Sequence, residues 1–144
     1  LNVQEADRGT NLGAAFQYVR NVLKKRSVCF VLSDFMGENY DAAMRTMALR
    51  HDCVGIHCWD PRERKLPDVG LLRVRDAESG NHIWLDTTDP VLRSHYQEQF
   101  DDNRARAETI FRKAGADFLS LQITDSYASM LLHFFEKRAR IAAH

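Results

Sequence analysis

No run of about 18 consecutive apolar residues occurs in this sequence, so we expect no segment of it to span a membrane. No apolar segment followed by a cleavage site gives a secretory signal either. Twenty basic residues balance twenty acidic ones, and this zero net charge lacks the overall positive field typical of nucleic-acid-binding domains. We therefore expect a cytoplasmic protein that binds neither nucleic acid nor, through this segment, a membrane.

Cysteine is scarce, with three residues in 144. Cys29, Cys53 and Cys58 are odd in number, lie in apolar stretches and lack the spacing of zinc ligands. We expect small, buried, reduced thiols, which are typical of an intracellular compartment.

The common catalytic motifs are also absent. The sequence contains no phosphate-binding loop, no Gly-x-Ser-x-Gly elbow and no His-Glu-x-x-His pair. Asp34-Phe35-Met36-Gly37 differs from the kinase Asp-Phe-Gly motif because its glycine is displaced. His57 lies late in an apolar run, where a buried and hydrogen-bonded histidine is the main interpretation and a pocket-facing one the other. We expect no enzyme.

What is present is ordinary globular composition, 44% hydrophobic and 28% charged, in a length that suits one domain over residues 1–144. Apolar residues at three- and four-residue spacing predict helices, and short continuous apolar runs predict strands. The predicted helices run from Thr10 or Asn11 to about Lys25, Tyr40 to Arg50, Asp89 to Gly115, and onward from Asp125 or Ser126. The predicted strands are Val28–Leu32, Cys53–Cys58 with Trp59, and Phe118–Ile123.

This alternation predicts a doubly wound, mostly parallel three-layer α/β fold, Rossmann-like in class. Val28–Leu32 is apolar at every position, which is typical of a strand buried on both faces. Residues 70–87 interrupt the pattern, because Leu72 and Val74 alternate with arginines and a Ser-Gly-Asn turn follows. We expect an inserted β-hairpin there.

Two polar residues stand where such folds bind ligands. Asp34 follows the first strand, and ligands of doubly wound sheets lie beyond the carboxyl ends of the strands. Thr10 stands at a helix start. The structural alternatives are that Asp34 bonds backbone amides in its loop and that Thr10 is an N-cap.

Two charged segments allow similar alternatives. Lys24-Lys25-Arg26 complements a helix C-terminus or forms a basic patch. Arg62, Glu63, Arg64 and Lys65, in the loop from Asp60 to Pro67, are either a solvated charged loop or a docking surface.

The residues around Thr10 and Asp34 resemble a known fold. Gly9-Thr10-Asn11-Leu12-Gly13-Ala14-Ala15, a helix, and a strand ending Leu32-Ser33-Asp34-Phe35 are similar to the von Willebrand factor A-like fold. More closely, the chain resembles the bacterial "domain of unknown function" family number fifty-eight, whose genes commonly neighbour MoxR-type AAA+ ATPases. Further support comes from Arg50–Val54, Asp60–Gly70, Ile83–Thr87 and Phe134–Arg138.

The resemblance implies a metal-ion-dependent adhesion site, in which Thr10 would bind Mg²⁺ or Mn²⁺ directly and Asp34 through a water. Asn11, Phe35, Arg62, Glu63 and Arg64 are the candidate partner contacts around it. The Asp-x-Ser-x-Ser element of such sites is absent from these residues, and the chain begins at Leu1 without a methionine. We expect the later portion of a larger protein, with part of a site and no bound metal of its own.

The function expected from this resemblance is a protein-interaction module whose partner is a MoxR-type AAA+ ATPase. The alternative is an enzyme or receiver-like signalling domain that uses Asp34 as acid, base or phospho-acceptor. That alternative needs a lysine after a later strand, which Trp59-Asp60 and Thr124-Asp125 do not offer. A third interpretation is a structural fragment without a site.

The family's sheet would place its first strand beside Val28–Leu32. Without that neighbour, an apolar strand exposes unpaired backbone groups that pair readily with another chain. We therefore expect a homodimer through this edge or through the apolar surface that adjoins it.

Overall fold

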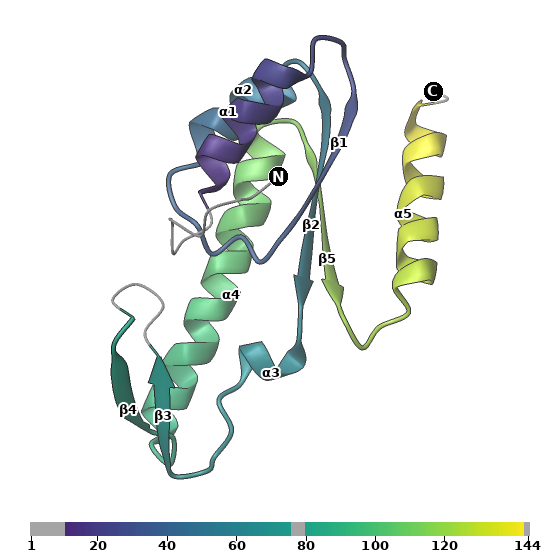
Figure 1. The fold of residues 1–144 in the computed structure, drawn as a ribbon. Helices are drawn as coiled ribbons and strands as arrows, with labels where there is room; N and C mark the ends of the chain where they lie inside the picture. Colours follow the sequence, from purple (N-terminus) through teal and green to yellow (C-terminus); the bar gives the residue numbers. More distant parts are fainter. Residues whose placement is uncertain (1–10, 76–79, 143–144) are drawn as a thin grey trace, which may run out of the picture.

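The computed structural model describes residues 11–75 and 80–142, which form five helices and five strands in the order shown in Figure 1. The elements are α1 (Leu12–Val22), β1 (Val28–Ser33), α2 (Asp41–Ala48), β2 (Asp52–Trp59), α3 (Pro61–Arg64), β3 (Leu71–Arg75), β4 (His82–Asp86), α4 (Pro90–Lys113), β5 (Asp117–Gln122) and α5 (Tyr127–Ala142).

The sheet is parallel, in the order β1-β2-β5. Helices α1, α2 and α4 lie on one face and α5 on the other, so the layers are helix, sheet and helix (Figure 1). Strands β3 and β4 form a separate antiparallel hairpin beside the first half of α4 (Figure 1). The predicted α/β class, the parallel sheet and the hairpin insertion are confirmed.

Short-range chemistry sets the helix ends. The Asn11 Oδ1 accepts a hydrogen bond from the Ala14 amide at 2.9 Å and caps α1. Asp89 caps α4 in the same way, with Pro90 at the first helical position, where its missing N–H costs nothing. Gly115 follows α4 with φ of +75°, a left-handed conformation that favours glycine. These three signals are legible in the sequence and act as predicted.

Two apolar cores lie on the two faces of the sheet. Beneath α1, α2 and α4, the core includes Leu12, Phe16, Met44, Met47 and Phe111. Under α5, a smaller core joins Val54, Ile56 and Leu121 to Met130, Leu131 and Phe134. Gly55 of β2 makes room for α4, because a Cβ there would lie 2.7 Å from the Phe111 Cε1 atom. The central strand therefore requires glycine opposite that ring.

The prediction that Val28–Leu32 is buried on both faces is wrong. Cys29 is buried, but Val28, Phe30 and Leu32 are 56%, 46% and 66% exposed. The reason is topological. β1 is an edge strand, and α5 packs over β2 and β5, reaching β1 through the Phe30–Phe135 ring contact at 5.9 Å. β2, in the middle, is the strand that is buried on both faces.

The segment between Asp60 and Pro67 also differs from the loop predicted for it, because it contains the short helix α3. The Asp60 side chain accepts from the Arg62 amide at 2.8 Å, and Pro61 takes the first helical position. This N-terminal capping chemistry gives one turn of helix directly after β2.

Helix α4 is the longest helix and spans about 36 Å. Its first half extends beyond the sheet, and α3 packs against it there (Figure 1). No helix in the described parts of the chain is both long enough and apolar enough to cross a membrane.

The cysteines are free thiols, as predicted. Cys29 and Cys53 are buried and lie opposite each other on β1 and β2, and Cys58 is half-buried. Burial raises the pKa of the Cys53 thiol to about 12, so it stays protonated at neutral pH. Thiolate, the reactive form, is therefore suppressed there.

Candidate functional site

The loop from Asp34 to Asn39 leaves the carboxyl end of β1, where sequence reasoning placed the site. Asp34 is exposed, and its Oδ1 accepts hydrogen bonds from the Met36 amide at 3.2 Å and from the Ser33 hydroxyl at 3.3 Å. This agrees with the structural alternative, a carboxylate that bonds its own loop. Within the described residues, no hydrogen bond occupies Oδ2.

Phe35 anchors this loop in the core and is fully buried, with φ of +55°. Its ring lies 5.2 Å from that of Phe111 and 5.5 Å from that of Phe118. The prediction that Phe35 contacts a partner is therefore wrong. The left-handed backbone turns the ring inward, and the aromatic core holds it there.

Helices α1 and α4 hold the loop from two sides. The Arg106 Nη2 donates to the Gly37 carbonyl at 2.8 Å, and the Asn103 amide contacts the Met36 sulfur at 3.6 Å. A Cβ on Gly13 would lie 3.6 Å from the Asn39 carbonyl oxygen, so the first turn of α1 contacts the loop. Asn11 is exposed at this end of α1, as its candidate role requires.

Thr10, the other predicted metal ligand, lies outside the described residues. The structure therefore places Asp34 but not Thr10. Among the residues that the structure describes, no three His, Cys, Asp or Glu side chains gather in a way that could hold a metal ion. Asp34 alone does not complete the octahedral oxygen shell that Mg²⁺ demands.

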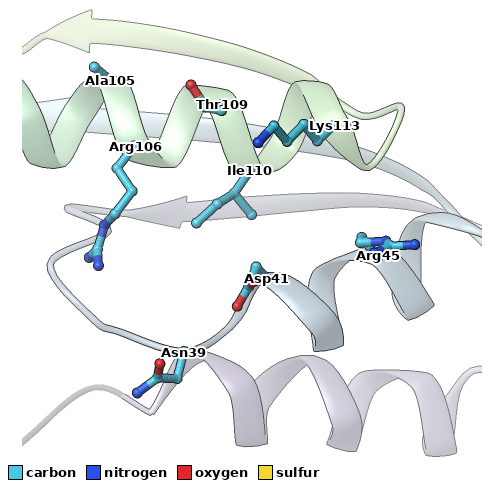
Figure 2. A pocket seen from close by; sticks show the side chains of 8 residues that line it. All are labelled: Asn39, Asp41, Arg45, Ala105, Arg106, Thr109, Ile110 and Lys113. Atoms are coloured by element: carbon cyan, nitrogen blue, oxygen red, sulfur yellow. The ribbon is translucent and has the colours of Figure 1, made fainter.

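A groove of about 730 Å³ continues from this loop between α2 and α4. Figure 2 shows Arg106 and Ile110 extending from α4 towards Asn39 and Asp41. Three cations, Arg45, Arg106 and Lys113, line it against one carboxylate, Asp41. The groove therefore favours an acidic group.

A buried polar network lies behind the loop. The His57 Nδ1 is 3.2 Å from the Ser120 hydroxyl, which also accepts from the Trp59 indole N–H at 3.1 Å. Burial lowers the pKa of His57, the charge of Arg104 lowers it further, and Asp34 opposes both. The interpretation of His57 as a buried, hydrogen-bonded histidine is confirmed.

This lowered pKa makes a testable prediction. Unfolded His57 binds a proton near pH 6.5 and the folded residue does so only at lower pH, so protonation favours the unfolded state. We expect its contribution to stability to be complete above pH 6.5 and to be lost as the pH falls towards the folded pKa. Urea unfolding of wild type and His57→Gln between pH 5 and 8 measures this, and parallel stability curves would contradict it.

The charged residues at α3 fall into two groups, one held by a contact with α4 and the other exposed to solvent. The Arg64 guanidinium forms a paired contact with Asp101 of α4, at 3.0 Å from Nε to Oδ1 and 2.7 Å from Nη2 to Oδ2. These hydrogen bonds lower the pKa of Asp101. Arg64 therefore secures α3, while Arg62 and Glu63 are exposed.

Sequence reasoning missed the α4 side chains that contact the loop, Asn103 and Arg106, and the cation Arg104 beside them on the same helix. One signal was present, because the apolar stripe of α4 is interrupted between Phe100 and Ala107. Arg104 stands on that stripe, and its Nε is buried without a hydrogen-bond partner among the described residues. A cation on an apolar stripe marks a place where another element brings polar groups.

These features define a parallel α/β domain with a polar loop fixed at the carboxyl end of its edge strand. The profile of the family described as "Protein of unknown function DUF58" matches residues 1–106, so the chain belongs to this family. The resemblance to family fifty-eight is thereby confirmed.

Its relatives include mycobacterial proteins described as uncharacterized. Those of Mycobacterium tuberculosis and Mycobacterium bovis are 32% identical over 137 residues, which is 93% of this chain and 43% of theirs. One from Mycobacterium avium is 29% identical over 131 residues, 90% of this chain and 77% of that protein. The chain thus spans less than half the length of the first two relatives. No solved structure matches it.

Proposed function

We propose that this chain is a non-enzymatic protein-interaction module whose partner binds at the carboxyl edge of the sheet. The observation that carries the proposal is Asp34, an exposed carboxylate on a loop fixed by the Phe35 ring and by the Arg106 contact with Gly37. A rigid loop loses little conformational freedom when a partner binds. Asn11, at the start of α1, and Arg62 and Glu63, which follow the carboxyl end of β2, are also exposed.

In the intact protein, we propose that Asp34 and Thr10 contribute to a Mg²⁺ or Mn²⁺ site. The free Oδ2 of Asp34 supports this, since a water held by the metal could donate to it. No three His, Cys, Asp or Glu side chains of the described residues gather to hold such an ion, so we propose that the remaining oxygen ligands come from elsewhere in the protein. The ion would supply an open coordination position for a partner carboxylate.

The partner proposed from the family resemblance is a MoxR-type AAA+ ATPase. The groove between α2 and α4 supports an acidic contact, because its cations Arg45 and Lys113 exceed its one carboxylate. The structure supports this proposal only through the positive charge of the groove. The identity of the partner rests on the resemblance alone.

The test is a titration of the intact protein with Mg²⁺ and Mn²⁺ by calorimetry. We expect Asp34→Ala to weaken metal binding about tenfold or more, because one hydrogen-bonded carboxylate is lost. Glu108→Ala removes an exposed carboxylate from α4 and should bind like wild type. Equal affinity in wild type and Asp34→Ala would refute the metal role, and stable phosphorylation of Asp34 by acetyl phosphate would favour the receiver-like alternative.

We further propose that chain 1–144 forms a homodimer through β1. Val28, Phe30 and Leu32 make an exposed apolar row, and β1 pairs with a neighbouring strand only on its β2 side within the described residues. A two-fold axis at Phe30 would join two such edges into one continuous six-stranded sheet. The unpaired backbone groups of β1 would then hydrogen-bond to the second copy. The apolar row would lie beside the same row of that copy.

A further inference from the structure

A second cavity lies at the opposite, amino edge of the sheet, the upper end in Figure 1, where α1 leads into β1. It has a volume of about 330 Å³ and collects residues from the end of α1, the segment after it and the turn after α2. Five of its lining residues are cations and none is acidic. They are Arg20, Lys24, Lys25, Arg26 and Arg50.

His51 also lines this cavity and is only 3% exposed. Neither ring nitrogen has a hydrogen-bond partner among the described residues. A buried polar group without a partner costs free energy, so such groups usually meet a ligand, an ion or a water. The nearby carboxylate of Asp52 is already paired with Arg138 at 2.6 Å. His51 therefore presents unused hydrogen-bonding capacity to the cavity.

The helix dipoles at this end of the sheet are too small to balance the positive charge of the cavity. The C-termini of α1 and α2 both lie here, and each carries about half a negative charge from the helix dipole. Together they offset about one of the five cations, which leaves a surplus of about four positive charges around one cavity. A compact anion with several charges matches that surplus, whereas a single carboxylate does not.

We propose that this cavity binds a phosphate-bearing ligand. Arginine forks and lysine ammonium groups are the side chains that bind phosphate oxygens in proteins, and the cavity holds three of the first and two of the second. His51 supplies a hydrogen bond from the buried wall. Lys24-Lys25-Arg26 is then the exposed rim of a binding site.

Calorimetry of the chain with pyrophosphate at low ionic strength tests this. We expect the combined variant Lys24→Gln, Lys25→Gln and Arg26→Gln to bind at least about tenfold more weakly, since each charge-assisted hydrogen bond contributes about that factor. The matched control is Arg73→Gln with Arg112→Gln, which removes two exposed cations that line neither this cavity nor the groove between α2 and α4. It should leave binding within twofold.

The His51→Gln variant tests whether His51 binds the ligand or only packs in the wall of the cavity. If His51 binds the ligand, pyrophosphate should raise the melting temperature of wild type more than that of the variant. An equal shift in both would contradict its role in the wall.

The two sources of phosphate are distinguished by vesicles. Binding to phosphatidylcholine vesicles that contain phosphatidylinositol phosphate, lost in the Lys24–Arg26 variant, would identify a lipid headgroup, and pyrophosphate binding without vesicle binding would identify a free ligand. Failure to bind either, equal loss in the Arg73→Gln and Arg112→Gln control, or binding of polyglutamate or a single-stranded oligonucleotide without pyrophosphate would overturn the proposal. None of these readouts involves Asp34 or a divalent metal.

Discussion

Phe111→Ala is expected to lower the free energy of unfolding by about 3–5 kcal/mol, as is typical of the truncation of a fully buried aromatic side chain. The Phe111 side chain is fully buried and lies between α4 and the central strand β2. Its removal would lose apolar burial and leave a cavity that β2 cannot fill, because the residue opposite is Gly55. Urea unfolding followed by circular dichroism measures the loss.

The control is Phe135→Ala on the other face of the sheet. Phe135 is 42% exposed, so its truncation should cost clearly less than that of Phe111. Equal losses in the two variants would contradict the assignment of Phe111 to the core.

The contact between Gly55 and Phe111 allows a stricter test. Gly55→Ala alone places a Cβ 2.7 Å from the ring and should cost about 1–3 kcal/mol through overpacking. In the Phe111→Ala background the ring is gone, so the same substitution should cost much less. A double-mutant cycle that gives additive effects would show that the close approach is absent in solution.

The effect should reach the candidate functional site. The Phe111 ring lies 5.2 Å from that of Phe35, which fixes the Asp34–Asn39 loop. In Phe111→Ala we therefore expect faster hydrogen exchange at the Met36 amide, whose acceptor is Asp34. The candidate functional site would thus lose the rigidity of its loop along with the stability of the domain.

Features set by short-range chemistry could be predicted from the sequence. The caps at Asn11 and Asp89, the helix end at Gly115 and the alternation of Leu72 and Val74 follow from contacts within a few residues. The order of helices and strands follows from these, and this alternation in turn predicts a parallel sheet. The position of Asp34 at the end of β1 could be predicted from the same short-range signals.

Features set by distant segments could not be predicted in this way. The apolar run of β1 indicates a strand, but which segments cover that strand depends on where α5 packs. Phe35 follows the exposed Asp34 directly, yet its burial depends on Phe111 and Phe118, more than 70 residues away in the sequence. The contact of Arg106 with Gly37 likewise joins two elements that only the fold brings together.

The exposed row on β1 gives the second large effect. We expect the combined variant Val28→Lys and Leu32→Lys to raise the dissociation constant of the dimer at least about 100-fold, as measured by analytical ultracentrifugation. In an antiparallel pairing centred on Phe30, residue 28 of one copy lies opposite residue 32 of the other. Lysines at both positions would therefore face each other across the new junction, and edge lysines oppose strand pairing.

Leu71→Lys is the matched control, because Leu71 is 69% exposed and lies on a strand of the separate hairpin. It should dimerise like wild type, and both variants should keep the wild-type circular dichroism spectrum since none of the three residues is buried. A wild-type chain that stays monomeric at high concentration would refute the homodimer. Dimer loss in Leu71→Lys alone would move the interface to the hairpin, and β1 would then remain an unpaired edge for a strand from elsewhere in the protein.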